Sequence, residues 1–288
     1  SHFVKKHIDN DKVHTYNEHF TIYDNTFLPK AFITALENEY RGTIYFEKWI
    51  LGNWVKAEGL VYPLFRRETH FLQPAEFARR YGRHRIRYVI IGGDGANTND
   101  STALVPLAIM DNGQAVRLEM FYHNPKINGQ LSNEQLVPYI QRYLQDLQDK
   151  YRFRENGVEF VMPIDCAAAD LVLTLAYRLP PEYNVQKFTK KDILQTTDVV
   201  NNALGRKAVC LLDFGGYFNY IKNEFVPGDD QLVIDLESMI WDEDNKKYDD
   251  SVPNDCADAF RYALNTYYNN PFNLWETPTM SAYYQGED

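Results

Sequence analysis

The spacing of apolar and polar positions divides the chain into an aromatic N-terminal region and a longer region of alternating strands and helices. Residues 1–65 are rich in aromatic side chains and show no alternating strand pattern before Trp54. They predict a helix over residues 29–40 and a second, short helix over residues 45–51. We therefore expect residues 1–65 to form a mainly helical appendage rather than a complete domain.

Short apolar, β-branched runs of the kind found in buried strands begin near residue 86. The first covers residues 87–92. The next two, over residues 103–110 and 115–122, are separated by Asp111-Asn112-Gly113, and Asn-Gly between two such runs is a strong hairpin signal. Later strands are predicted over residues 158–164, 183–188 and 208–212.

Helical patterns fill the intervals between these strands. Residues 133–150 predict a long helix that begins after Ser132, with Gln135 at the position that completes a capping box. The helix over residues 167–177 is apolar and has no polar face, which predicts that it is buried. An acidic, irregular stretch is expected up to Pro253. The remaining helices are predicted over residues 192–204, 216–225 and 255–268, the last with Asn254 as its N-cap.

A strand hairpin followed by strand–helix alternation indicates a mixed α/β sheet with helices on its faces. Residues 66–87, which carry several arginines, are interpreted as a basic joint in front of this domain. The domain itself is expected to span residues 88–270. Residues 271–288 are expected to form a mobile tail.

Composition and charge exclude several classes of protein. Of the 288 residues, 44% are apolar and 24% charged, which is typical of a globular protein, and no apolar run approaches the length of a membrane helix. The net charge of −10 argues against a protein that coats DNA by bulk charge. The cysteines are too few and too scattered for a disulfide framework or a zinc site, and this favours a reducing cytoplasm: Cys166, Cys210 and Cys256.

Four aspartates lie at the ends of predicted elements. Asp94 follows the first buried strand and Asp165 ends a later one, and active sites of open α/β sheets are found at such strand ends. Asp255 and Asp258 share one face of the first turn of the last helix. Converging carboxylates repel one another unless a cation neutralises them, and Mg²⁺ and Mn²⁺ prefer oxygen ligands. The alternative interpretation is that each aspartate caps a helix or decorates a first turn.

Several motifs stand in a distinctive order along the chain. The N-terminal part contains Tyr23-Asp24-Asn25-Thr26-Phe27-Leu28-Pro29, Gly52-Asn53-Trp54-Val55 and Glu58-Gly59-Leu60-Val61-Tyr62-Pro63-Leu64-Phe65. These motifs resemble the joint between the ATPase and nuclease domains of the large terminase subunits of tailed phages. The nuclease motifs are matched by Asp94 with Asp100-Ser101-Thr102-Ala103-Leu104, by Ile164-Asp165, and by Asn254-Asp255-Cys256-Ala257-Asp258-Ala259-Phe260-Arg261-Tyr262-Ala263.

This resemblance implies a ribonuclease H-like fold and a metal-dependent endonuclease that cuts concatemeric phage DNA during packaging. It implies two divalent ions, Mg²⁺ or Mn²⁺, with Asp94, Asp165 and Asp258 as core ligands. Asp255 takes a position that is His or Asp in different members, and Cys256 stands where many members have His. Implied partners are double-stranded DNA, an N-terminal ATPase domain, the small terminase subunit and the portal protein, in the cytoplasm of the infected bacterium.

The family's ATPase half carries the phosphate loop Gly-x4-Gly-Lys-Ser/Thr, and this chain contains no such run. We therefore expect no ATP hydrolysis, and residues 1–65 are interpreted as what remains of the linker to the ATPase domain.

Two basic clusters are candidates for DNA phosphate contacts. One lies in the basic joint: Arg79, Arg80, Arg83 and Arg85. The other follows the strand at residues 183–188: Lys187, Lys190 and Lys191. The alternative is that both clusters are solvated surface.

Other functions remain open on the sequence alone. Another ribonuclease H-like resolvase, a phosphohydrolase and a non-catalytic module that docks on the portal all fit the pattern. The run from Gly93 to Asp100 also resembles the acidic loop of haloacid dehalogenase-like phosphatases, but Asp9-Asn10-Asp11 is a poor candidate for their nucleophile loop.

Overall fold

A computed structural model describes most of the chain, as two compact units. The units comprise Ser1–Pro63 with Ile234–Pro253, and Leu64–Val233 with Asn254–Asp288. The described residues are 18–40, 50–52, 59–95, 101–189, 192–242, 247–249 and 254–269. Most of the predicted helix over residues 45–51 and the whole predicted tail over residues 271–288 lie outside them.

The first unit contains a short 3-10 helix, η2 (Ile22–Asp24), and the helix α1 (Lys30–Tyr40), which confirms the helix predicted over residues 29–40. The Tyr23 hydroxyl donates a hydrogen bond of 2.5 Å to Glu37 Oε1 and so ties η2 to α1. Isolated bridges pair Leu60 with Ile240 and Trp241 with Tyr248.

The second unit is built on a mixed sheet with the strand order β1-β8-β4-β3-β2-β6-β7, and β5 pairs with β3 beside this path. β3 runs antiparallel to β2 and β4, whereas β6, β7, β8 and β1 extend the two sides of the sheet in parallel pairs. The strands are β1 (Phe71–Leu72), β2 (Ile86–Gly95), β3 (Thr102–Met110), β4 (Ala115–Arg117), β5 (Phe121–His123), β6 (Glu159–Asp165), β7 (Val185–Phe188) and β8 (Val209–Leu212). The predicted hairpin at Asn112-Gly113 joins β3 to β4, with Gly113 at φ +84°.

The strand predicted over residues 115–122 is interrupted between β4 and β5. Leu118 N donates to Pro106 O on β3 at 3.1 Å. Pro106 has no N–H to return this bond, which leaves the Leu118 carbonyl without its ladder partner. Arg117 Nη1 donates to that carbonyl at 3.2 Å instead. The proline therefore accounts for the break and for one contact of a buried arginine.

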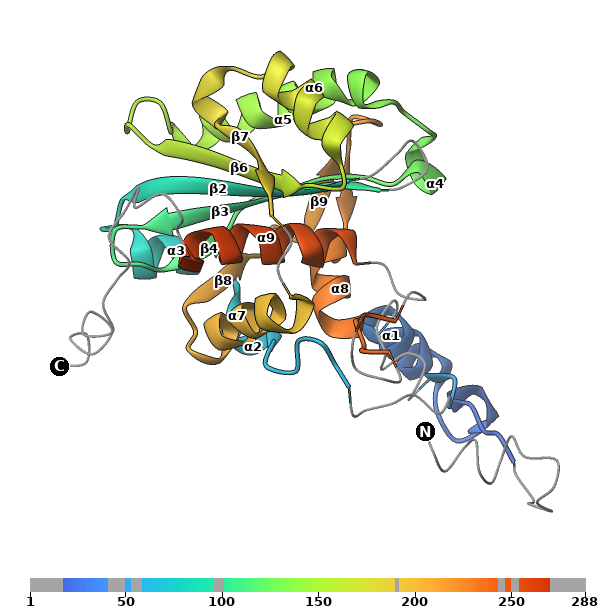
Figure 1. Cartoon of the computed structure of the whole chain (residues 1–288). Helices are drawn as coiled ribbons and strands as arrows, with labels where there is room; N and C mark the ends of the chain where they lie inside the picture. Colours follow the sequence, from blue (N-terminus) through green and yellow to red (C-terminus); the bar gives the residue numbers. More distant parts are fainter. Residues whose placement is uncertain are drawn as a thin grey trace. The chain divides into compact units, whose positions relative to one another are not determined.

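Helices cover both faces of the sheet (Figure 1). α5 (Asn133–Tyr151) and α6 (Ala169–Arg178) pack on one face, and α7 (Ile193–Gly205) and α9 (Asp255–Asn269) on the other. The shorter helices are α2 (Arg67–His70), α3 (Pro74–Tyr81), α4 (Pro125–Asn128) and the 3-10 helix η4 (Pro181–Tyr183). Among the described residues, no helix combines the length and the apolar character needed to cross a membrane.

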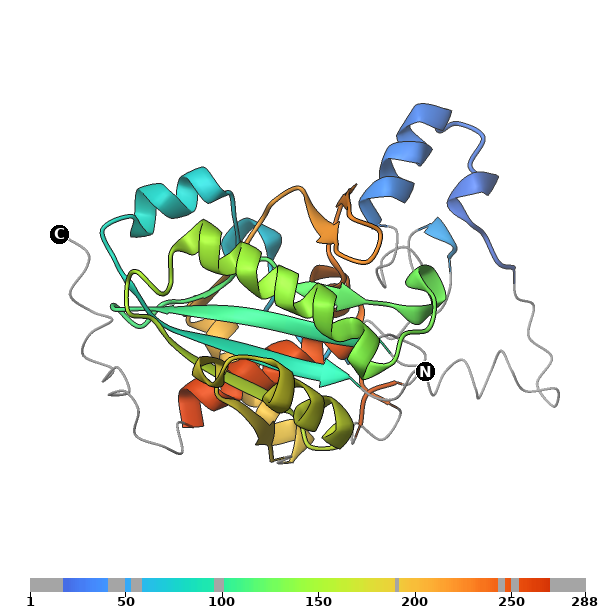
Figure 2. The same cartoon turned by 90° about the horizontal axis from the view of Figure 1, so that it is seen from above.

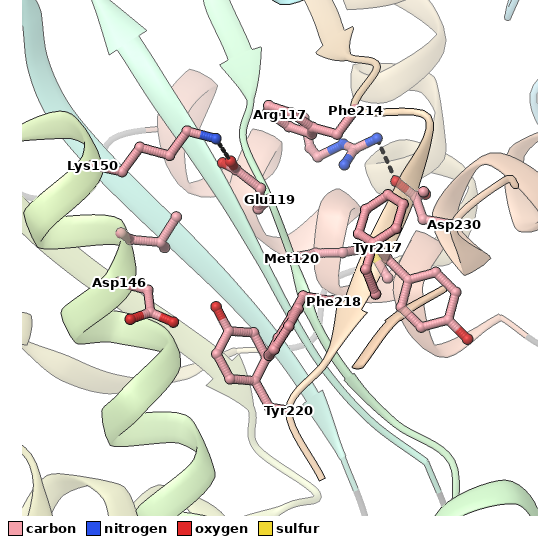
Figure 3. Close-up of a pocket in the computed structure, with 13 residues that line it drawn as sticks. Arg117, Glu119, Met120, Asp146, Lys150, Phe214, Tyr217, Phe218, Tyr220 and Asp230 are labelled. Carbon is pink, nitrogen blue, oxygen red and sulfur yellow. Dashed lines mark hydrogen bonds and ion pairs between the residues drawn. The ribbon is translucent and has the colours of Figure 1, made fainter. Parts of the chain in front are cut away.

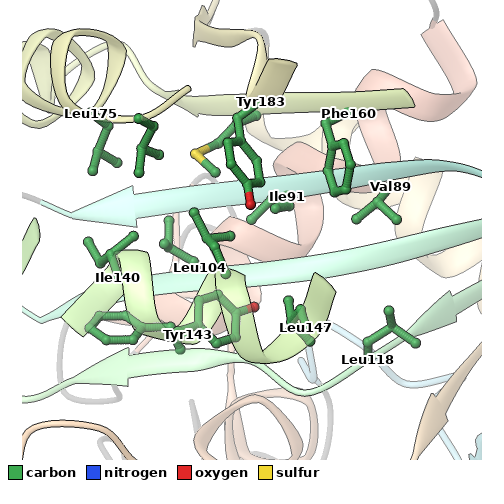
Figure 4. Close-up of a cluster of buried hydrophobic side chains, with 14 of the residues drawn as sticks. Val89, Ile91, Leu104, Leu118, Ile140, Tyr143, Leu147, Phe160, Leu175 and Tyr183 are labelled. Carbon is green, nitrogen blue, oxygen red and sulfur yellow. The ribbon is translucent and has the colours of Figure 1, made fainter. Parts of the chain in front are cut away.

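One cluster of buried apolar side chains lies between the sheet and the helices α5 and α6 (Figure 4). Val89 and Ile91 of β2 and Leu104 of β3 contribute from the sheet, and Ile140 and Leu175 from the helices. The predicted capping box of α5 is confirmed, because Ser132 Oγ accepts from Gln135 N and Gln135 Oε1 accepts from Ser132 N. Seen from above, α5 lies along the strands (Figure 2).

Three sequence predictions are wrong. The segment predicted as a helix over residues 216–225 is a hairpin of β9 (Gly216–Asn219) and β10 (Glu224–Pro227). The Asn219 side chain accepts from Ile221 N and Lys222 N, each at 3.1 Å, and Asn223 has a φ of +56°. These turn interactions compete with the helix that the apolar spacing indicated.

The second error concerns the acidic stretch before Pro253, which contains the helix α8 (Gln231–Ser238). The charged composition of that stretch obscured the helical spacing of Leu232, Val233 and Leu236, which are buried. The third error concerns α6, which is buried on one side only, because Leu173 is 64% exposed and Tyr177 82% exposed.

Candidate active site

Alternation along β2 directs Asp94 toward α9. Val89 and Ile91 belong to the core under α5 and α6, so Ile90, Gly92 and Asp94 lie on the opposite face. α9 packs against that face. The carboxylate at the end of β2 and the helix that carries Asp255 and Asp258 are therefore on the same side of the sheet.

Gly92 allows α9 to approach β2 closely. A Cβ atom at this position would lie 1.9 Å from the carbonyl oxygen of Ala259 and 2.9 Å from the amide nitrogen of Ala263. Only a glycine opposite two alanines leaves room for the two backbones to pack at this distance. This contact fixes the position of the first turns of α9 against the end of β2.

Asp165 ends β6, the parallel neighbour of β2. Ile164 faces α5 and α6 as part of the core, so Asp165 faces α9 like Asp94. Its side chain is almost fully buried, at 5% exposure. Oδ1 accepts from Ala167 N at 2.9 Å, and Oδ2 accepts from the Tyr262 hydroxyl at 3.2 Å. The turn after the strand thus uses one carboxylate oxygen, and α9 supplies a donor to the other.

Tyr262 of α9 interacts electrostatically with three of the candidate aspartates. Burial raises the pKa of its hydroxyl, and the negative charges of Asp258, Asp94 and Asp165 raise the pKa further. Its ring stacks on Phe188 of β7, with the ring centroids 4.5 Å apart. The sequence analysis treated Tyr262 only as part of a motif. Its position one helical turn after Asp258, on the same face of α9, was a signal for a role at the site.

Arg261 holds Asp258. Its Nε and Nη2 approach Asp258 Oδ1 at 3.2 and 2.9 Å, and its Nη1 donates to Thr196 Oγ1 of α7 at 2.8 Å. Both side chains of the ion pair are largely buried, with exposures of 6% for Arg261 and 15% for Asp258. Asn265 strengthens the same junction by donating to Thr196 O at 2.9 Å. The first turns of α9 are therefore fastened to α7 as well as to β2.

The residue types at this site fit a hard divalent cation, since all the candidate ligands are carboxylates. Within the described residues, however, no group of three or more His, Cys, Asp or Glu side chains is close enough together to hold a metal ion. The carboxylates are positioned instead by protein donors, with Asp165 on Tyr262 and Asp258 on Arg261. Asp255 lies three residues before Asp258 in the first turn and is partly exposed.

The three cysteines are free. Cys166 is exposed beside Asp165, and Cys256 is buried beside Asp255. Cys210 of β8 is buried as well, and burial raises the pKa of its thiol to about 12.

The arginines of the basic joint lie far from these aspartates. Arg79 and Arg80 of α3 are ion-paired with Glu76, whose pKa their hydrogen bonds lower to about 2. Arg85 precedes β2, whereas Asp94 is at its other end, and nine residues of strand span about 30 Å. Arg83 and Arg85 are exposed. The structure does not bring this cluster to the aspartates.

Lys187 lies at the correct edge of the sheet but on the opposite face. It pairs with Ile164 across β6 and β7, one position before the pair of Asp165 with Phe188. Because Phe188 faces Tyr262, Lys187 points away from α9, and its side chain is exposed. Lys190 and Lys191 lie outside the described residues.

Comparison with solved structures identifies the fold. A large terminase from a thermophilic bacteriophage matches 92% of this chain with 22% identity and a TM-score of 0.50. The chain shares the fold of part of a phage large terminase. The sheet is the ribonuclease H-like mixed sheet, flanked by helices, that the sequence predicted.

The match covers 58% of that bacteriophage protein, so the chain spans a little over half the length of the large terminase it resembles. Two isolated nuclease structures are also similar. The nuclease domain of the large terminase from bacteriophage SPP1, solved with bound Mn, matches 68% of this chain and 94% of its own, at 14% identity and a TM-score of 0.41. The large terminase nuclease of the thermophilic phage G20c, solved with bound magnesium, matches 73% of this chain and 98% of its own. The sequence identity is 14% and the TM-score is 0.43.

Searches against protein-family models and against curated protein sequences found no match.

Proposed function

We propose that this protein is a metal-dependent DNA endonuclease of a phage DNA-packaging motor. The observation that supports the proposal is that three aspartates from separate elements lie on the face of the sheet that α9 covers. Asp94 comes from β2, Asp165 from β6 and Asp258 from α9, and the charges of all three raise the pKa of Tyr262. The shared fold with a large terminase and the order of the acidic motifs point to the same function.

In this proposal Asp94, Asp165 and Asp258, with Asp255 beside them, hold two divalent ions, Mg²⁺ or Mn²⁺. Such ions supply charge neutralisation and an activated water for phosphodiester hydrolysis. The residues around them act on the carboxylates. Tyr262, kept protonated by its raised pKa, donates to Asp165, and Arg261 holds Asp258 in place.

The substrate is double-stranded DNA, cut with little sequence preference, because a site of this kind acts on the phosphate backbone. We propose that the full-length protein adds an ATPase domain, works with the small terminase subunit and the portal protein, and acts in the cytoplasm of the infected bacterium. This chain hydrolyses no ATP in the proposal, since its sequence has no phosphate loop.

A plasmid-nicking assay tests the proposal. Supercoiled plasmid should be nicked and linearised in the presence of Mn²⁺ or Mg²⁺, and cleavage should stop when EDTA is added. Asp94→Asn, Asp165→Asn and Asp258→Asn should each lose cleavage. Asp149→Asn is a matched control, because Asp149 lies on the exposed surface of α5, where it accepts a hydrogen bond from Gln145.

The outcome separates the alternatives. Cleavage that survives the asparagine variants removes those residues from the mechanism. A preference for branched DNA over linear duplex favours a related resolvase, and hydrolysis of small phosphate esters favours a phosphohydrolase. A folded protein that cleaves none of these substrates favours a module that docks on the portal.

DNA binding by the basic joint is tested separately. Replacing Arg79, Arg80, Arg83 and Arg85 with alanine should weaken DNA binding and reduce its salt dependence. Metal binding should not change, because Arg85 precedes β2 and lies about 30 Å from Asp94 along the strand, and the other three arginines come earlier in the chain. Unchanged DNA binding would make the joint a structural connector and direct the search to Lys187, Lys190 and Lys191.

A further inference from the structure

A cavity lies on the opposite face of the sheet from the aspartates. It has a volume of about 400 Å³ and is lined by α5, by the segment between β4 and β5, and by the β9–β10 hairpin (Figure 3). This volume is within the range of small-molecule sites. Five aromatic side chains line one side of it, and they come from the hairpin and the segment around it: Phe214, Tyr217, Phe218, Tyr220 and Phe225.

A buried guanidinium group is part of this wall. The Arg117 side chain is 1% exposed and forms an ion pair of 2.6 Å with Asp230. Its Nη1 donates to Leu118 O, the carbonyl that Pro106 leaves without a partner. Its Nε has no hydrogen-bond partner among the described residues. A buried N–H without a partner is costly, so an acceptor from a ligand would stabilise it.

Carboxylates outnumber cations in the cavity. Lys150 is paired with Glu119, and Arg117 with Asp230. Asp146 adds a third carboxylate, to which the Tyr220 hydroxyl is hydrogen-bonded. A phosphate or another anion would be repelled by this set. A neutral group that both accepts and donates hydrogen bonds is compatible with it.

We propose that this cavity binds a purine base. A planar ring stacks on aromatic side chains, and stacking of this kind is a main source of affinity for bases. Purines carry acceptor and donor atoms on neighbouring positions of one edge. The acceptor satisfies Arg117 Nε, and a donor meets the carboxylate of Asp146, since Glu119 already accepts from Lys150 and Tyr151. The chemistry is that of a base rather than of a nucleotide phosphate, and its source is either a free nucleoside or an unpaired base in DNA.

Calorimetric titration of the folded chain with guanosine and with adenosine tests the proposal. Saturable binding of at least one nucleoside is expected. Phe225→Ala should weaken it at least about fivefold, the lower end of what loss of one stacking partner costs. Phe225 is 54% exposed at the cavity wall, so this variant should fold like the parent. Tyr177→Ala is the matched control, since Tyr177 is an exposed aromatic residue of α6 outside the cavity and its removal should not change binding.

Arg117→Lys keeps the charge near Asp230 and removes Nε, and binding should be lost if this variant folds. Asp146→Asn tests the same cavity at an exposed residue and should weaken binding even if Arg117→Lys does not fold. A single-stranded oligonucleotide that competes with the nucleoside identifies an unpaired base as the source, and failure to compete identifies a free nucleoside. Absence of saturable binding by the parent, or equal binding by Phe225→Ala and Asp146→Asn, overturns the proposal. The readout is binding, so it does not depend on nuclease activity.

Discussion

Replacing Arg261 with methionine tests whether the ion pair with Asp258 holds the first turns of α9. Methionine keeps much of the side-chain volume but removes every hydrogen bond from the guanidinium. Asp258 then loses its cationic partner, and Thr196 loses the donor that links α7 to α9. The variant therefore isolates the polar contacts of this junction from its packing.

The magnitude follows from burial. Removing one partner of a buried ion pair typically costs about 3–5 kcal/mol, because the remaining charge stays desolvated. Asp258 is 15% exposed, and water partly rehydrates it. We therefore expect the free energy of unfolding to fall by about 3 kcal/mol, the lower end of that range. Plasmid cleavage should fall as well, because Asp258 is then free to change rotamer.

Urea unfolding followed by circular dichroism provides the measurement. The matched control is Arg79→Met, which removes the arginine of another acidic–basic pair at i, i+3 on a helix. That pair is Glu76 with Arg79. Because Arg79 is 73% exposed and exposed ion pairs contribute little to stability, the urea midpoint of unfolding should not shift measurably. Equal midpoints for Arg261→Met and the parent would refute the reasoning. A destabilised Arg261→Met variant that cuts DNA normally would leave the ion pair a purely structural role.

Three further predictions follow from the fold and the site. Gly92→Ala should destabilise the protein by roughly 2–3 kcal/mol in urea unfolding, because the new Cβ would lie 1.9 Å from the backbone carbonyl oxygen of Ala259. Gly93→Ala should cost less in the same experiment, because its new Cβ would approach only side-chain atoms, those of Ile164 at 2.9 Å and Leu104 at 3.1 Å. The pKa values of Tyr151 and Tyr262 are raised by burial above the usual value of about 10, so the folded state keeps protons that the unfolded state releases. Their contribution to the free energy of unfolding should thus be fully present below about pH 10 and be lost as the pH rises above it, so the urea midpoint should fall there, and a stability that rises with pH above about pH 10 would contradict the assignment. Cleavage of a long linear duplex should give a smear of products, and discrete bands would contradict a site that acts on the backbone.

The local signals in the sequence were sufficient for the strands that carry the site. Buried β-branched runs, the Asn112-Gly113 turn and the Ser132 capping box depend on neighbours a few residues away, so they could be interpreted without the fold. These signals predicted a mixed α/β sheet with helices on its faces. The ribonuclease H-like class was implied only by the resemblance of the acidic motifs.

Two errors of the sequence analysis had local causes: the β9–β10 hairpin replaced a predicted helix because Asn219 bonds to its own turn, and α8 appeared where charge had obscured its apolar spacing. The contacts at the candidate site, by contrast, join segments far apart in the chain. The hydrogen bond between Tyr262 and Asp165 joins residues 97 positions apart in the sequence, and the one between Arg261 and Thr196 joins residues 65 positions apart. The sequence by itself determined the strands β2 and β6, the helix α9 and the carboxylates at their ends, because propensity and periodicity are local. Only the tertiary structure decided that the basic joint lies at the far end of β2 and that α9 brings its aspartates to the sheet, because helix packing and strand order set those distances.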